Sequence, residues 1–206
     1  MGRGSSGAGK GGGKVMNTNK DAIDYFTSPP PPGGSYGDWS DKLTAAEDNW
    51  IYEYTGVSYR TINERLRNGH TNGIEQAVAC MDDGIAKFEL KDDIKVYRGV
   101  SSSALKDLFG NRYISADEIN KNFKGATVRD KAYLSTATNP GASFGGRVRF
   151  EITVRKGKGK GAFVAPMSKH KSESEFLLKR STPLKIKGAR RTGEPPFDTL
   201  IIECEC

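Results

Sequence analysis

The stretch RVRFEITVRKG, residues 147–157, alternates apolar and polar side chains. Its apolar positions are Val148, Phe150, Ile152 and Val154, and charged or hydroxylated residues stand between them. Successive side chains of a β-strand point to opposite faces of a sheet, so a period of two predicts a half-buried strand. The core of the protein is therefore expected to be built around a β-sheet.

Further strands are expected on both sides of this stretch, and helices are expected before all of them. Short apolar runs bounded by glycine, proline or charge predict strands at residues 94–100, 161–166, 175–179, 183–188 and 199–205. Apolar residues at helical spacing predict helices at residues 43–55, 58–69 and 73–88, and two short ones at 103–110 and 115–123. Helices followed mostly by strands indicate an α+β fold rather than alternating βαβ units.

The first 35 residues differ in composition from the rest of the chain. Glycine dominates the beginning, and SPPPPGG, residues 28–34, comes at the end of this segment. Glycine loses the most backbone entropy on folding and offers nothing apolar to bury, so residues 1–35 are interpreted as a disordered tail or linker. Residues 36–206 are long enough to form one domain with a single core.

Composition also argues against several classes of protein. The chain has no run of the ~20 apolar residues that a membrane span needs, and its beginning lacks the apolar core of a signal peptide. The three cysteines do not have the spacing of a zinc site, so no metal is expected. Four charges of the net +7 lie in the glycine-rich beginning (Arg3, Lys10, Lys14 and Lys20) and the rest of the surplus is mostly spread out, which does not favour a nucleic-acid partner.

Two carboxylates stand before an apolar run in KSESEFLL, residues 171–178. On a strand, Glu173 and Glu175 would project from the same face, because residues two apart point the same way. Both could then address one bound molecule. The same pattern is also expected of a solvated acidic pair that balances the charge of neighbouring lysines.

Two other patterns suit a phosphate and a ribose. Arg98 ends the strand expected at 94–100, and Gly99 after it allows a ligand to come close. A planar guanidinium donates two parallel hydrogen bonds to phosphate, although a surface salt bridge is the simpler explanation. Ser135 and Thr136 follow an apolar pair, and their hydroxyls could orient a carboxylate, contact a ribose or cap a turn.

Together and in this order, the motifs resemble those of the mono-ADP-ribosyltransferases of the R-S-E clade, which include binary actin toxins and Rho-modifying exoenzymes. The arginine is Arg98 in YRG, the serine is Ser135 in YLSTA, and the Glu-x-Glu motif is Glu173 to Glu175. The resemblance extends over about residues 39–203. It implies the toxin-like fold of this family, with N-terminal helices packed on a two-sheet mixed β core.

The resemblance also implies NAD as co-substrate and assigns roles to residues. FGGR, residues 144–147, resembles the loop in which Phe144 packs against nicotinamide and Arg147 meets the pyrophosphate. YTGVSYRTIN resembles a helix that contacts NAD. The residues implied to bind NAD are Arg98, Ser135, Thr136, Phe144, Arg147, Tyr54, Tyr59, Asn63 and Glu175. Those implied to be catalytic are Glu175, Glu173, Ser135 and Arg98, with Glu175 essential and Ser135 holding it in place.

The implied activity is cleavage of NAD and transfer of ADP-ribose to a protein side chain, with Glu173 indicating arginine as the acceptor. An NAD glycohydrolase and a non-catalytic phage structural or binding module stay open as alternatives. The expected place of action is the cytosol of a target cell, reached by secretion or injection, or else a virion. A delivery or immunity protein is a further expected partner. Any enzymatic role requires Arg98, Ser135 and Glu175 to meet at one pocket sized for a folded dinucleotide.

Overall fold

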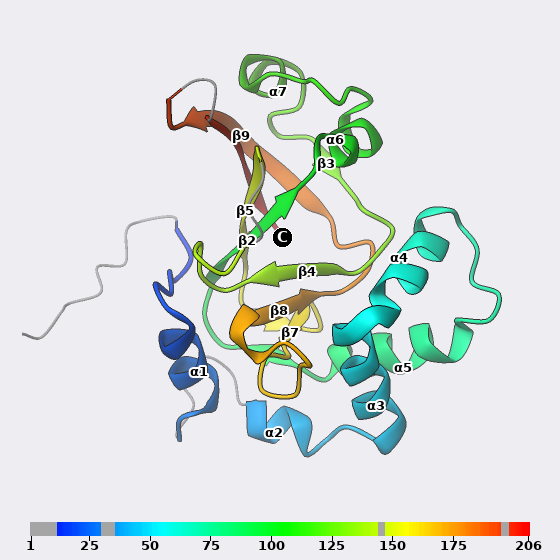
Figure 1. Ribbon diagram of the computed structural model, residues 1–206. Helices are drawn as coiled ribbons and strands as arrows, with labels where there is room; N and C mark the ends of the chain where they lie inside the picture. Colours follow the sequence, from blue (N-terminus) through cyan, green and yellow to red (C-terminus); the bar gives the residue numbers. More distant parts are fainter. Residues whose placement is uncertain (1–11, 30–35, 144–146, 195–197) are drawn as a thin grey trace, which may run out of the picture.

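A computed structural model describes residues 12–29, 36–143, 147–194 and 198–206 (Figure 1). The helices are α1 (Asn19–Thr27), α2 (Tyr36–Ser40), α3 (Ala45–Glu53), α4 (Tyr59–Arg67), α5 (Glu75–Ala86), α6 (Ser102–Phe109) and α7 (Ala116–Asn122). A π-helical turn η1 (Tyr54–Ser58) and a 3-10 turn η2 (Lys171–Glu173) complete them. The strands are β1 (Glu89–Leu90), β2 (Ile94–Val100), β3 (Thr127–Val128), β4 (Leu134–Ala137), β5 (Val148–Val154), β6 (Gly157–Lys158), β7 (Gly161–Phe163), β8 (Glu175–Leu178), β9 (Leu184–Thr192) and β10 (Thr199–Glu205).

An eight-stranded sheet runs through the molecule in the order β3-β9-β10-β5-β2-β4-β8-β7, and β1 pairs with β6 separately. The sheet is mixed, because β10 and β5 are parallel whereas β2 and β5 are antiparallel. Strand β2 meets β4 only at the pair Tyr97 and Ala137. The sheet therefore bends there into a five-stranded and a three-stranded half, whose strands run in different directions in Figure 1. These halves correspond to the two-sheet core of the expected α+β fold, and that fold class is confirmed.

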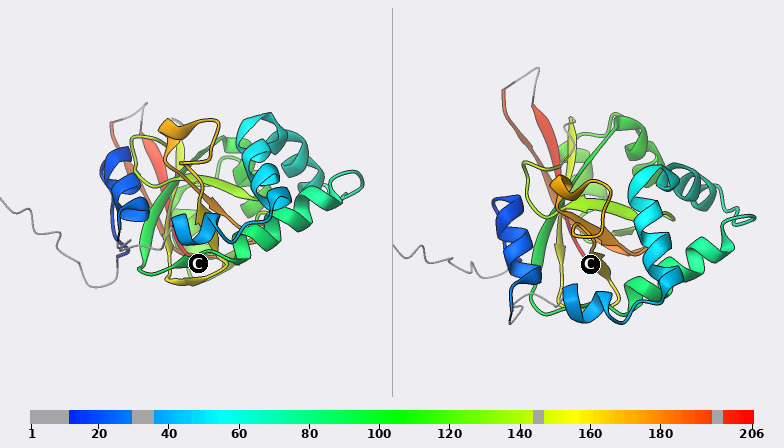
Figure 2. Two further views of the ribbon diagram at one scale, coloured as in Figure 1. Left: turned by 90° about the horizontal axis from the view of Figure 1, so that it is seen from below. Right: turned by 60° about the horizontal axis from the view of Figure 1, so that its bottom comes forward.

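Helices α3 and α4 form where the sequence signals predict them. Thr44 caps α3: its N–H donates to the Glu47 carboxylate (2.7 Å), and the Glu47 N–H donates to the Thr44 hydroxyl (3.3 Å). Helix α4 ends before Asn68 and Gly69, and Gly69 adopts the positive φ of 75° that favours glycine after a helix. Helices α3, α4 and α5 lie together at one side of the sheet, with α5 against β7, whereas α7 packs on β9 (Figure 2).

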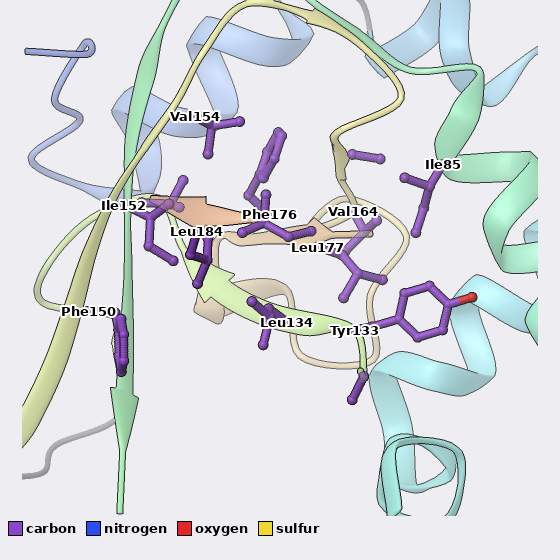
Figure 3. Packing of buried hydrophobic residues seen from close by; sticks show 14 of the residues in the cluster. Ile85, Tyr133, Leu134, Phe150, Ile152, Val154, Val164, Phe176, Leu177 and Leu184 are labelled. Carbon is purple, nitrogen blue, oxygen red and sulfur yellow. The ribbon is translucent and has the colours of Figure 1, made fainter. Parts of the chain in front are cut away.

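The hydrophobic core joins both halves of the sheet to the helices (Figure 3). The apolar side chains of β5 that the alternation predicts as buried are buried, including Phe150 and Ile152. In β8 all four residues are buried, so this strand is covered on both faces. A strand of that kind reads as a continuous apolar run, as Phe176, Leu177 and Leu178 do. Glu175, the first residue of β8, is thereby drawn into the protein interior.

Residues 12–29 are part of the domain, so the prediction of a disordered tail over residues 1–35 is wrong for this part. Residues 12–29 carry α1, and Thr18 and Asp21 form a capping box at its start. The ring of Phe26 is fully buried and stacks on that of Phe163, with ring centroids 4.3 Å apart.

The sequence analysis did not predict α1, because it judged residues 1–35 by their high glycine content as a whole. Ala22, Tyr25 and Phe26 recur at helical spacing and are all buried. The backbone of Lys14 adds a second attachment, since its N–H donates to the Asp93 carbonyl (2.7 Å) and its carbonyl accepts from Lys95 (2.9 Å). Burial of these apolar side chains offsets the conformational entropy that residues 12–29 lose on folding. The glycine-rich composition had suggested that this cost would not be met.

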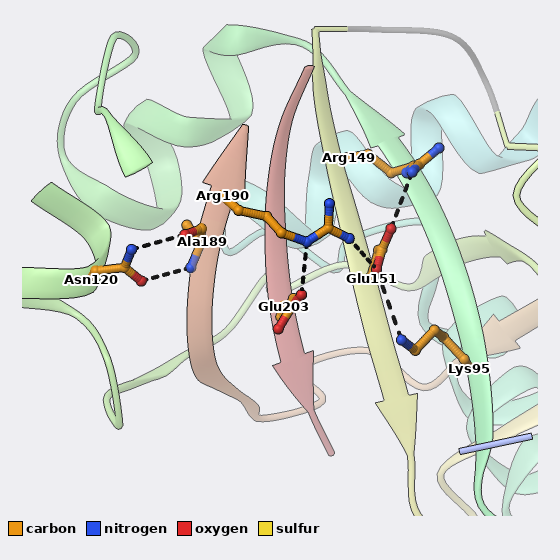
Figure 4. A network of polar contacts seen from close by, with 7 residues as sticks. All are labelled: Lys95, Asn120, Arg149, Glu151, Ala189, Arg190 and Glu203. Carbon is orange, nitrogen blue, oxygen red and sulfur yellow. Dashed lines mark hydrogen bonds and ion pairs between the residues drawn. The ribbon is translucent and has the colours of Figure 1, made fainter. Parts of the chain in front are cut away.

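A charged cluster lies on the polar face of β5 (Figure 4). Glu151 is only 8% exposed, because three cations surround its carboxylate. Arg149 lies at 3.1 Å, Arg190 at 3.2 Å and Lys95 at 3.9 Å, and Arg190 also reaches Glu203 at 3.1 Å. These contacts join β2, β5, β9 and β10 side by side. Buried carboxylates are tolerated where cations pair with them in this way.

No helix among the residues that the structure describes combines the length and apolarity needed to cross a bilayer. Cys80, Cys204 and Cys206 are all free thiols. Within the same described ranges, no three His, Cys, Asp or Glu side chains are grouped so that they could hold a metal ion.

The docking of α1 can be tested by its effect on stability. Phe26→Ala should lower the free energy of unfolding by about 3–5 kcal/mol, the usual cost of deleting a buried aromatic ring. Val15→Ala is the control in the same segment, because Val15 is 48% exposed. Urea denaturation measures both. A loss below about 1 kcal/mol for Phe26→Ala would contradict the packing of α1 on the core.

Candidate active site

Three neighbouring strands carry Arg98, Ser135 and Glu175. Arg98 lies on β2, Ser135 on β4 and Glu175 at the start of β8, and β4 stands between the other two strands. Ala137 pairs with Tyr97 on one side and with Glu175 on the other, so the three strands meet where the sheet bends. All three side chains line one cleft of about 660 Å³, a volume within the ~300–1,000 Å³ usual for small-molecule sites.

Glu175 is a buried carboxylate at the centre of this arrangement, only 4% exposed. Burial raises the pKa of Glu175 to about 7, and the negative charge of Glu173 adds to the rise. A hydrogen bond from Ser135 and the positive charge of Arg98 act in the opposite direction and lower its pKa. Near neutral pH the carboxyl group is therefore poised between its neutral and charged forms.

Arg98 faces the cleft rather than a surface partner. Its Nη1 donates to the Ser135 carbonyl oxygen (2.7 Å), and it forms no ion pair with any residue that the structure describes. Burial lowers the pKa of Arg98, but a guanidinium stays charged in proteins. A half-buried cation whose other N–H donors have no described partner is suited to bind an anionic ligand.

Glu173 and Glu175 do not share a strand, so the expectation that both project from one strand face is wrong. Glu173 ends the turn η2, and Ser174 has a left-handed backbone conformation (φ 45°, ψ 48°). The reason is the length of the neighbouring strands: β4 and β7 end at Ala137 and Phe163, which leaves no ladder partner before Glu175. Glu173 still lines the same cleft, but it reaches the cleft from a turn.

The turn before Glu175 is held by its neighbour in the loop after β4. The Thr138 N–H and hydroxyl both donate to the Ser174 carbonyl, at 3.1 and 3.0 Å. The Glu175 carbonyl accepts from the Val164 N–H (3.0 Å). Ser174 itself is buried, and its hydroxyl has no partner among the described residues. A left-handed serine costs roughly 1–2 kcal/mol, so these bonds hold a strained turn in place.

Another wall of the cleft comes from the irregular turn η1 and from α4. Gly56 interrupts the helix with φ −92° and ψ −110°, and π-type turns are frequent at functional sites. Tyr54 is buried and its hydroxyl accepts a hydrogen bond from Asn63 Nδ2 (2.8 Å). The Oδ1 of Asn63 is buried without a described partner. Tyr59 is partly exposed, and Tyr54, Tyr59 and Asn63 all line the cleft.

Three other candidate residues are placed differently from one another. Thr136 lines the cleft, but its hydroxyl donates to the Phe176 carbonyl and so ties β4 to β8. Arg147 is exposed and is not among the residues that line the cleft; its backbone carbonyl accepts from Leu200 (2.8 Å) at the start of β5. Phe144 lies outside the described residues.

The cleft also contains residues that the sequence analysis did not identify. Arg67 lines it and donates to the Asp130 carboxylate from Nε (3.0 and 3.2 Å to its two oxygens) and from Nη2 (2.8 Å). Arg60 lines it too. Both belong to α4, three residues before and four residues after Asn63, which are the spacings that share a helix face. That spacing is the signal that could have found them.

The family comparison agrees with this geometry. Residues 34–205 match the family described as ADP-ribosyltransferase exoenzyme. NAD(+)-arginine ADP-ribosyltransferase EFV of Enterococcus faecalis is 31% identical over 148 residues, which cover 69% of this chain and 29% of that protein. Mono-ADP-ribosyltransferase C3 of Hathewaya limosa is 32% identical over 161 residues, which cover 70% of this chain and 64% of that protein. The chain thus matches less than two thirds of the length of either relative.

Solved structures show the same fold. Plx2a, an ADP-ribosyltransferase toxin from Paenibacillus larvae, superimposes with a TM-score of 0.78 over 93% of this chain and 98% of that one, at 24% identity. At this identity the likeness concerns the fold alone. The family match extends over most of the sequence, so the chain belongs to the ADP-ribosyltransferase exoenzyme family.

Proposed function

We propose that this chain is a mono-ADP-ribosyltransferase that cleaves NAD, releases nicotinamide and transfers ADP-ribose to an arginine side chain of a target protein. The observation that carries the proposal is the meeting of Arg98, Ser135 and Glu175 in one cleft, with Glu173 on a turn that lines the same cleft. Membership of the family supports it, as does similarity to a relative whose name specifies NAD and arginine.

NAD as co-substrate fits the polar groups of the cleft. Arg98 binds the pyrophosphate, since its guanidinium offers several donors toward the cleft. Asn63 Oδ1 is a buried acceptor without a described partner, and a ribose hydroxyl or an adenine amine would satisfy it. Phe144 and Arg147 keep the roles that the family resemblance implies, contact with nicotinamide and with the pyrophosphate.

Cleavage breaks the bond between C1′ of the ribose and the nicotinamide nitrogen. Nicotinamide leaves with the electron pair of that bond, so positive charge develops on the ribose as in glycoside hydrolysis. The ionised Glu175 stabilises this charge and accepts a hydrogen bond from the 2′-hydroxyl. Ser135 orients the Glu175 carboxylate through its hydrogen bond. The positive charge of NAD's nicotinamide ring favours ionisation of Glu175 when the co-substrate binds.

Transfer of ADP-ribose then needs a carboxylate that orients the acceptor side chain and takes its proton. An arginine guanidinium holds its proton with a pKa above ~12 and is a poor nucleophile until a base orients it. Glu173 is the base in this proposal: a guanidinium nitrogen forms the bond to C1′, and its proton passes to the Glu173 carboxylate. A position on a half-exposed turn suits this role, because a protein substrate must approach from solvent.

Isosteric variants of the two glutamates should separate cleavage from transfer. Glu175→Gln should slow nicotinamide release by about 10²–10³-fold or more, the scale of losing one preorganised electrostatic group. Glu173→Gln should keep nicotinamide release and lose labelling of protein from biotin-labelled NAD. The exposed Glu194→Gln serves as the control. Chromatography measures nicotinamide, and blots of bacterial and eukaryotic lysates measure protein labelling.

Other results of the same experiment would assign another function. Equal nicotinamide release by the parent and Glu173→Gln, with no protein labelled by either, would indicate an NAD glycohydrolase. An absence of saturable NAD binding, with no difference between the parent and Arg98→Ala, would indicate a non-catalytic binding module.

Because Glu175 is buried and ionisable, its effect on the free energy of unfolding should depend on pH. The pKa in the folded protein, about 7, lies above the usual ~4.3 of an unfolded glutamate. The stability of the parent therefore falls as the pH rises from ~4, where the unfolded state begins to ionise, to about 7, and this loss is absent below pH ~4. Glu175→Gln should be more stabilising at pH 8 than at pH 5, by roughly 2.5 kcal/mol. Urea denaturation at both pH values measures the difference, and equal effects at both would contradict a buried carboxyl group with a raised pKa.

We propose that the target protein lies in the cytosol of another cell and that this chain reaches it by secretion or injection. The lysate labelled in the preceding experiment, bacterial or eukaryotic, identifies the kind of cell. A delivery protein, and an immunity protein that would cover the cleft if the enzyme is toxic to its maker, are further proposed partners, and purification of the chain with its bound proteins tests for them. Detection of the chain in purified virions would favour the phage alternative.

A further inference from the structure

A chain of hydrogen bonds that starts at α1 connects two loops at the cleft. Asn19, the first residue of α1, donates from Nδ2 to the Ser172 carbonyl. Its Oδ1 accepts from Asn139 Nδ2 at 2.6 Å. Asn139 in turn accepts from the Ala142 N–H at 2.9 Å. One side chain from the N-terminal segment thus contacts both the loop after β4 and the turn that carries Glu173.

The direction of every bond in this chain is fixed by its two ends. The Ala142 N–H can only donate and the Ser172 carbonyl can only accept. Both asparagine amides must therefore take one orientation, with oxygen toward Ala142 and nitrogen toward Ser172. Asn139 is only 4% exposed, so its end of the link is shielded from water, whereas Ser172 lies at the surface. A fully satisfied network of this kind favours a single arrangement of the loops.

Asn19 stands on a rigid support. The capping box of Thr18 and Asp21 fixes the first turn of α1, and the buried Phe26 fixes the helix against the core. The Tyr25 hydroxyl donates to Asp92 at 2.6 Å. The side chain of Asn19 is therefore held in place by elements far from the cleft.

The turn that Asn19 holds is also held from its other side. Lys169 donates from its backbone N–H to the Thr55 hydroxyl (3.0 Å), and its Nζ lies 2.9 Å from Glu53. Ser172 is one residue before Glu173. Between these two attachments, the backbone before Glu173 is fixed at both ends, whereas Glu175 is fixed separately by the β8 ladder.

We infer that Asn19 is a positioning residue that sets the place of Glu173 relative to the cleft, so that the N-terminal segment 12–29 is a working part of the enzyme. Asn19 lies before residue 34, where the family match begins. The inference rests on the proposed function for its effect on catalysis. Because Glu175 is held independently, loss of the Asn19 link affects transfer to the acceptor more than cleavage of NAD.

Two measurements on the full chain test this. In Asn19→Ala, amide hydrogen exchange should become about fivefold faster in peptides covering residues 138–143 and 170–174, the scale of one lost hydrogen bond. The ratio of protein labelling to nicotinamide release should also fall about fivefold. General destabilisation would lower both activities together and leave their ratio unchanged. Asn17→Ala is the matched control, since Asn17 is an exposed residue of the same segment and its side chain has no described hydrogen bond.

A second variant separates the two halves of the link. Asn19→Asp keeps an oxygen that can accept from Asn139 but removes the donor to Ser172, and an acidic residue in the first turn favours the helix. It should speed exchange at 170–174 and leave 138–143 protected. Exchange is independent of activity, so it decides the inference even where no labelling occurs. Unchanged exchange at 170–174 in both variants, or a labelling ratio equal to that of an active parent, would overturn it.

Discussion

The carboxylate of Glu175 is withdrawn from water at the bend of the sheet, between the Ser135 hydroxyl and the positive charge of Arg98. Burial of that carboxylate destabilises its charge, and a site that can restore the charge when a cationic ligand arrives has a built-in driving force for catalysis. This burial results from the strands that surround Glu175. Strand β8 is covered on both faces, and β4 places Ser135 one strand away.

The second carboxylate obeys a different constraint. Glu173 lies on a turn rather than in the sheet, a position that suits the proposed contact with an incoming protein side chain. Such a turn needs external support, because Ser174 is in a strained conformation. Thr138 supplies this support from β4's loop, Lys169 from the side of η1, and Asn19 from α1. The two glutamates thus differ in exposure and in the elements that hold them, which suits the proposed division of labour between cleavage and transfer.

Local signals in the sequence predict much of this fold. The alternation in β5 and the Thr44 capping box each depend on a few neighbouring residues, and the structure contains both. The prediction that Glu173 and Glu175 share a strand face was wrong. The first residue of β8 depends on where β4 and β7 end, and these strands are distant in the sequence. Asn19 and Ser172 are 153 positions apart, and no local pattern records such a contact. Helix α1 was missed since glycine around it outweighed three apolar residues at helical spacing.

A crystal structure of the protein with a non-hydrolysable NAD analogue tests this arrangement most directly. The 2′-hydroxyl of the nicotinamide ribose should lie within hydrogen-bonding distance of the Glu175 carboxylate, with the pyrophosphate at Arg98. A dinucleotide bound at another surface, or one bound in this cleft with its nicotinamide ribose away from Glu175, would contradict it.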